Sequence, residues 1–199
     1  CDWSSDVCSS DLRGPEPSLK WKRFSEELLD LFDDLEIDLV VTLGSLLADV
    51  PHTRPISVTG TSSNPELAKS FGVEVSRYEG PTGTLGIIQD ACQRRDLDAI
   101  SLWAAIPHYA SGSPSPKATF ALLEELEDFL DISIPAGDLP DAAKAWEIAV
   151  TQIASEDSDI SEYVKQLEAD KDDSDLEETT GDVIAKEFER YLKRQGDSQ

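Results

Sequence analysis

DAISLWAAIPHY, residues 98–109, is the clearest indication of the fold class in this sequence. Its apolar residues run from Ala99 to Ile106 almost without interruption, which is typical of a strand buried on both faces rather than on one. IDLVVTLG, residues 37–44, has the same continuous character and predicts a second buried strand. Strands of this kind occur mainly in parallel sheets that helices cover on both faces.

Helical patterns alternate with these strands. The first lies in residues 14–35, where we expect Ser18 to be the N-cap and where six apolar residues share one face: Trp21, Phe24, Leu28, Leu31, Phe32 and Leu35. A short β segment at 55–61 precedes a helix that Asn64 caps and Gly72 ends. Further helices are expected at 82–95 and from Ser115 onward. This alternation predicts an α/β fold, a three-layer α/β/α arrangement with a mostly parallel sheet.

The composition changes after residue 138. Three helical patterns follow without a strand, at 141–154, 159–169 and about 182–194, and the Asp-rich stretch 169–180 between the last two reads as an acidic linker. We therefore expect a partial α/β domain at 13–138 and an acidic α-helical C-terminal extension at 139–199. Narrow apolar stripes on these helices predict that they dock on the α/β body or on another subunit.

CDWSSDVCSSDL, residues 1–12, fits one reading frame of a common sequencing-library adapter. We expect this stretch to be an artefact and the protein to be truncated at its N-terminus. Cys92 is then the one remaining cysteine, which fits a reducing cytoplasm. Within its helical pattern, Cys92 reads as a small buried residue rather than a nucleophile.

The formal net charge of −24 constrains the choice of partner. Such an acidic surface repels phosphate backbones and anionic lipids, so we expect neither nucleic acid nor membrane as a partner. No apolar run approaches the roughly 18 residues that a membrane span needs. The one basic cluster, Lys20 with Lys22 and Arg23, reads as a solvated helix face. Together these observations favour a cytoplasmic protein.

Two Pro-His dipeptides follow predicted strands and supply the candidate catalytic residues. His52 in VPHTRP and His108 in IPHYAS would lie where the carboxyl ends of parallel strands form the usual ligand crevice. With Arg54 and Tyr109 nearby, they could act as general base, anion clamp and hydrogen-bond donor. Alternatively, each histidine caps a turn or ties a loop down. Neither has the spacing of a metal site, and we expect no metal and no cofactor.

RYEGPTGTLG, residues 77–86, places glycines ahead of a predicted helix. Gly80 and Gly83 could present backbone N–H groups to a phosphate or carboxylate ligand. Glu79 is a further candidate catalytic residue, although its charge would oppose a phosphate there. The spacing matches neither of the common phosphate-binding glycine motifs. A tight turn with close helix packing explains the glycines equally well.

Four long blocks resemble one family. RGPEPSLKWKRF, VVTLGSLLADVPHTRPISVTGT, RYEGPTGTLGIIQDAC and SLWAAIPHYASGSPSPKAT, in this order, are similar to the actinobacterial branch of the proteasome assembly chaperone two (PAC2-like) family. The resemblance implies a phosphorylase-like α/β/α fold and homo-oligomers. Its eukaryotic relatives are chaperones that help proteasome α-subunits form rings. Family members also carry an N-terminal region with a Gly- and Asn-rich loop, which this chain lacks.

Two hypotheses therefore stand. In the first, the protein is a non-catalytic oligomeric scaffold or proteasome-assembly-chaperone-like protein that binds protein partners, possible proteasome components among them. In the second, it is a small-molecule enzyme of phosphorylase or hydrolase type that uses the Pro-His loops. The absence of catalytic signatures such as G-x-S-x-G or H-E-x-x-H favours the first. Whether the protein is an enzyme stays open at this point.

Overall fold

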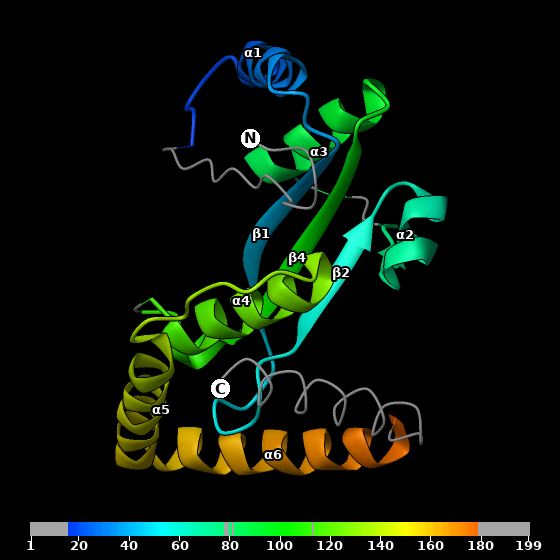
Figure 1. Ribbon diagram of the computed structural model, residues 1–199. Helices are drawn as coiled ribbons and strands as arrows, with labels where there is room; N and C mark the ends of the chain where they lie inside the picture. The colour runs from blue at the N-terminus through cyan, green and yellow to red at the C-terminus, as the bar shows by residue number, and fades with distance from the viewer. Residues whose placement is uncertain (1–15, 78–79, 81, 113, 179–199) are drawn as a thin grey trace. The chain divides into compact units, whose positions relative to one another are not determined.

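The computed structural model describes residues 16–77, 80, 82–112 and 114–178 (Figure 1). It confirms a mixed α/β fold in which helices flank a mostly parallel, four-stranded sheet and further helices follow. The elements are α1 (Trp21–Asp34), β1 (Leu39–Ala48), β2 (Val58–Ser62), α2 (Pro65–Phe71), β3 (Glu74–Val75), α3 (Thr84–Arg94), β4 (Asp98–Pro107), the 3₁₀ turn η1 (His108–Ala110), α4 (Pro116–Leu130), α5 (Leu139–Glu156) and α6 (Ser158–Glu178).

The strand order in the sheet is β1-β4-β2-β3, and β3 pairs in parallel with β2. β4 occupies an inner position, and most of its residues are buried, as its continuous apolar run predicts. β1 is longer than expected and forms one edge of the sheet. Its first half is buried, but Leu43, Leu46 and Leu47 are exposed. Within the strand expected at 37–44, the prediction of burial fails at Leu43; Leu46 and Leu47 lie beyond that range, in the part by which β1 is longer than expected.

The chain divides into two compact units, and strands β1, β2 and β4 contribute residues to both. The first unit comprises residues 1–42 and 60–101. In it α1 packs against α3, and the core contains Leu29, Val40, Ala91, Cys92 and Ala99. The Arg95 guanidinium joins α3 to α1 through Asp30 and Asp33, each at 2.6 Å. These contacts fix both helices on the beginning of β1 and β4.

The ends of α2 are the ones predicted from its capping residues, whereas the predicted N-cap of α1 is wrong. Asn64 accepts hydrogen bonds from the N–H groups of Glu66 and Leu67, and Gly72 ends α2 in the left-handed region, at φ 67°, as predicted. Ser18 is not the N-cap of α1. The helix starts at Trp21 after Lys20, whose φ of 60° turns the chain into the helix without a side-chain cap.

The second unit comprises residues 43–59 and 102–199. α4 packs against α5, α5 packs against α6, and Trp146 and Val150 of α5 form a small core with Ala110. The apolar stripe of α4 is half-buried rather than buried. α6 continues to Glu178, through most of the stretch expected to be an acidic linker. Asp170, Asp172 and Asp173 are exposed there, and Val164 and Leu167 of the same helix are buried. The helix expected at 182–194 lies outside the described residues.

Candidate functional site

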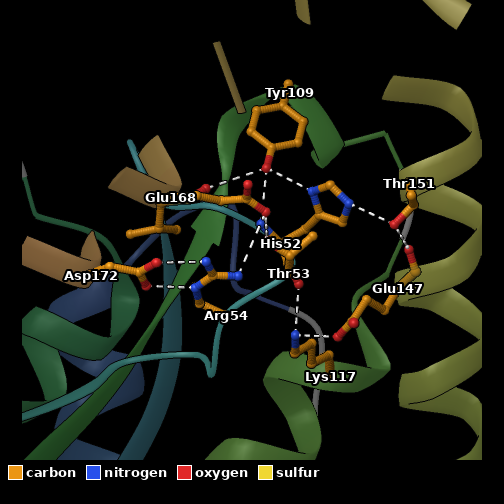
Figure 2. A network of polar contacts seen from close by, with 10 residues as sticks. His52, Thr53, Arg54, Tyr109, Lys117, Glu147, Thr151, Glu168 and Asp172 are labelled. Carbon is orange, nitrogen blue, oxygen red and sulfur yellow. Dashed lines mark hydrogen bonds and ion pairs between the residues drawn. The ribbon is translucent and has the colours of Figure 1, made fainter. Parts of the chain in front are cut away.

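Residues 49–57 connect β1 to β2, and we call the first six of them the 49–54 loop. Pro51 and His52 in it are buried although they belong to a connection, and such burial requires partners for every polar group. Figure 2 shows how η1, α4, α5 and α6 supply these partners. All of these elements belong to the second unit.

His52 is the centre of the network. Its side chain and backbone are almost fully buried, with 1% exposure. Its Nε2 lies 3.0 Å from the Thr151 hydroxyl, which itself donates to the Glu147 carbonyl oxygen at 2.8 Å. Since the Thr151 proton is used in that bond, His52 Nε2 must carry the proton that Thr151 accepts. His52 Nδ1, 2.9 Å from the Tyr109 hydroxyl, is then the acceptor.

The hydrogen bonds and the burial both favour a neutral imidazole. Tyr109 donates to His52 Nδ1 and accepts the backbone N–H of His52, also at 2.9 Å. Burial lowers the pKa of His52; the Glu147 and Glu168 carboxylates oppose this effect and the Lys117 ammonium adds to it. Burial is also the main cause that raises the pKa of Tyr109, so this side chain stays a hydroxyl.

Charged groups surround the same loop. Lys117 of α4 donates to the His52 carbonyl oxygen at 2.6 Å and forms an ion pair with Glu147 of α5. Arg54 makes a two-pronged pair with Asp172 of α6, with both N–O distances at 2.7 Å. This pair lowers the pKa of Asp172. Thr53 donates to Glu168, one turn before Asp172. The loop is therefore tied to three helices at once.

A second group of side chains lies beside His52 at the surface. The rings of His52 and His108 each contact the Tyr109 ring edge-on, at centroid distances of 5.7 and 5.8 Å. His108 is exposed, and its Nδ1 lies 3.2 Å from the Asp49 carboxylate. Tyr163 of α6 donates to the same carboxylate at 2.9 Å. The structure thus brings the two Pro-His dipeptides to one place, as their positions after β1 and β4 suggest.

The other candidate residues are placed differently. Arg54 belongs to the same loop as His52, but its guanidinium points to Asp172. Gly80 and Gly83 belong to the first unit. At the start of α3, after Gly83, the Thr84 N–H and hydroxyl both donate to Glu16, so a carboxylate of this chain takes the place expected for an external anion. Glu79 lies outside the described residues.

Several residues of the network escape sequence reasoning. They are Lys117, Glu147, Thr151, Tyr163, Glu168 and Asp172. Their spacing carries a partial signal, because Glu147 and Thr151 are four residues apart on one helix and so are Glu168 and Asp172. The spacing shows that each pair shares a helix face. Only the folded chain shows that both faces meet the 49–54 loop.

A groove of about 380 Å³ runs between the 49–54 loop and α6. Asp49, Val50 and Pro51 form one wall, and residues of α6 from Tyr163 to Ser174 form the other. Neither histidine is part of the lining. In the part of the chain that the structure describes, no group of His, Cys, Asp or Glu side chains could hold a metal ion. Among the same residues, no helix has the length and apolar character to span a membrane.

The profile of the PAC2 family matches residues 10–154. A PAC2 family protein from Streptomyces avermitilis is 52% identical, with a TM-score of 0.71, over 76% of this chain and 64% of that one. A proteasome-assembly chaperone homologue from Mycobacterium tuberculosis is 49% identical, with a TM-score of 0.66, over 75% and 63%. No curated protein matches the chain.

The fold also extends to more distant proteins. PbaA of Pyrococcus furiosus, an archaeal homologue of proteasome-assembly chaperone, is 19% identical with a TM-score of 0.56, over 83% of this chain and 67% of that one. At this identity the likeness shows the fold alone. The chain spans less than two thirds of the length of the Streptomyces and Mycobacterium proteins.

Proposed function

Because the chain belongs to the PAC2 family, we propose that it is a non-catalytic, chaperone-like protein that binds protein partners related to the proteasome. The name of the Mycobacterium relative, a proteasome-assembly chaperone homologue, supports the class of partner. As the resemblance implies, we infer that the protein acts in the cytoplasm as a homo-oligomer.

The main structural support for a non-catalytic role is that both ring nitrogens of His52 are already used in hydrogen bonds. A general base needs a ring nitrogen that can take a proton from a substrate. Here Nε2 carries a proton that it donates to Thr151, and Nδ1 accepts from Tyr109. Arg54, the candidate anion clamp, is already paired with Asp172. The geometry therefore supports a network that holds the loop and the helices together, and it gives the small-molecule enzyme little support.

A binding role needs an exposed surface, and α5 offers one. Ile148 and Ile153 are 69% and 64% exposed, whereas Trp146 and Val150 of the same helix are buried. Ala145, three residues before Ile148, and Ala149, directly after it, are also exposed. Large exposed apolar side chains that recur on one helix are typical of protein–protein contacts. We infer that this surface of α5, defined by Ala145, Ile148, Ala149 and Ile153, contacts the partner.

The test is affinity capture of proteasome subunits from an actinobacterial lysate, quantified by mass spectrometry. The unsubstituted chain should enrich these subunits. Ile148→Glu should reduce the enrichment about tenfold or more, the usual scale for the loss of a central apolar contact. Gln152→Glu is the matched control, because it adds the same charge at an exposed polar position of the same helix.

Equal capture by both variants would show that the α5 surface is not the contact. Failure of the unsubstituted chain to enrich any proteasome subunit would remove the proposed class of partner. Turnover of nucleoside or ester substrates that His108→Gln abolishes would favour the enzyme instead.

A further inference from the structure

The 49–54 loop is held in place from two sides, and His52 makes the contacts of the first side. Its ring donates to Thr151 of α5 and accepts from Tyr109 of η1. Its carbonyl oxygen accepts from Lys117 of α4. These three contacts involve no residue of α6 (Figure 2). They would keep His52 in place if α6 moved away from the loop.

The residues on either side of His52 make the contacts of the second side, with α6. The three helix residues that take part span about 14 Å of the helix axis, so α6 is held along its length rather than at one end. The helix can leave the loop only by giving up all three contacts. The pairs are Asp49 with Tyr163, Thr53 with Glu168, and Arg54 with Asp172.

α6 has little buried apolar surface to hold it on its neighbours. Val164 and Leu167 are 7% and 8% exposed, whereas Ile160 and Tyr163 are half-buried. α5, which is three residues shorter, buries four residues. Packing of an apolar face is the main source of helix stability in a folded protein, and α6 gains little from it. The three polar contacts with the loop therefore decide whether the helix stays docked.

Charge within α6 makes Arg54 the most important of these contacts. The helix carries nine acidic residues and two lysines, so repulsion between its own side chains exceeds attraction. Glu168 and Asp172 are four residues apart and both face the loop. The Arg54 guanidinium lies 3.7 Å from the first carboxylate and 2.7 Å from the second. One cation thus offsets the repulsion within this pair, and it lowers the pKa of Asp172.

The docked helix covers aromatic and apolar groups of the site in part. The ring of Tyr163 meets the Tyr109 ring edge-on, at a centroid distance of 6.3 Å. Val50 and Pro51 of the loop and Leu167 of α6 line the groove that lies between them. Pro51 and Leu167 are buried while the helix is docked. Release of α6 from the loop would therefore expose them.

We propose that α6 is a strap that opens from the 49–54 loop as one unit, and that Arg54 is the clamp that keeps the strap closed. In the open state α4, α5 and the three contacts of His52 stay in place. Opening exposes Pro51 and Leu167, so the strap controls access to this apolar surface. The strap is independent of the partner surface proposed on α5.

Hydrogen exchange of the full chain, read by mass spectrometry of its peptides, tests the proposal. In the unsubstituted chain the protection factors of α6 should be about tenfold or more below those of α5, because a unit that opens locally exchanges from its open state. Arg54→Gln should lower the protection of α6 by a further factor of about three to ten and leave α5 unchanged. Arg23→Gln is the matched control, because it removes the same charge from an exposed ion pair within α1.

A charge swap separates the ion pair from other effects of the substitution. Arg54→Asp should lower the protection of α6 more than Arg54→Gln does, and adding Asp172→Arg to Arg54→Asp should restore part of it. Equal protection of α5 and α6 in the unsubstituted chain, lost together in Arg54→Gln, would show one cooperative unit and overturn the proposal. An effect of Arg54→Gln no larger than that of Arg23→Gln, or a swap that restores nothing, would also overturn it.

Discussion

Replacing Tyr109 with phenylalanine removes one oxygen atom on which the 49–54 loop depends. That oxygen accepts the backbone N–H of His52, donates to His52 Nδ1 and lies 3.5 Å from the Val50 carbonyl oxygen. The aromatic ring and its packing against Ala110, Trp146 and Val150 are retained. The substitution therefore reports on hydrogen bonding without creating a cavity.

The expected cost follows from what is left unpaired. The His52 N–H and Nδ1 both belong to a residue that is 1% exposed. Each buried group left without a partner costs about 1–3 kcal/mol. Tyr109 is half-buried, so water can recover part of this loss, and we expect the free energy of unfolding to fall by about 2–3 kcal/mol. In a protein of this size that change lowers Tm by about 4–12 °C.

Thermal and urea unfolding followed by circular dichroism measure the change. Tyr163→Phe is the control, because it also deletes a phenolic oxygen from the same group of rings. Its hydrogen bond ends on the exposed Asp49 carboxylate, where water can replace it, so the loss of stability should be clearly smaller than in Tyr109→Phe. Equal losses in the two variants, or no loss in Tyr109→Phe, would refute the view that the buried His52–Tyr109 pair stabilises the loop.

Three further predictions follow from the same structure. The pKa of His52 is lower in the folded chain than in the unfolded chain, so as the pH falls the unfolded chain takes up a proton on this side chain before the folded chain does. Stability should therefore be complete above about pH 6.5 and decline as the pH falls towards the folded-state pKa, and His52→Gln should flatten this decline in urea titrations between pH 7 and 5. Gly44→Ala would place a Cβ 2.5 Å from the Trp103 ring and should cost about 1–3 kcal/mol, whereas Gly112→Ala, with open space around it, should change the free energy of unfolding by less than about 0.5 kcal/mol. Burial raises the pKa of Cys92 to about 11, so thiol alkylation of its peptide at pH 8, read by mass spectrometry, should be slow until denaturant is added; fast native labelling would place this thiol outside the core.

Local patterns predict much of the fold because the physics that sets them is local. Asn64, Pro65 and Gly72 define α2 by capping chemistry alone, and the apolar run of β4 reflects burial from both sides. The same reasoning ends β1 at Gly44, four residues early, and does not predict that Leu43 is exposed. Burial of a strand's side chains depends on what covers the two faces of the sheet, and a single run of residues does not contain that information.

In the candidate site, too, some features could be predicted from the sequence and others depend on residues far apart in the chain. Both Pro-His dipeptides could be found from the sequence, because they follow strands whose ends meet. The state of His52 could not, because it depends on Thr151 of α5 and Tyr109 of η1, which are far away along the chain. Likewise, the Asp-rich stretch 169–180 reads as a linker, whereas α6 continues through most of it.

We propose that this chain binds protein partners through the α5 surface and does not use the His52 network for catalysis. Isothermal titration of the purified chain with purified actinobacterial proteasome subunits tests it most directly. We expect saturable binding that Ile148→Glu weakens about tenfold or more and that Gln152→Glu and Tyr163→Phe leave unchanged. Absence of binding, or binding that Ile148→Glu does not affect, would contradict it.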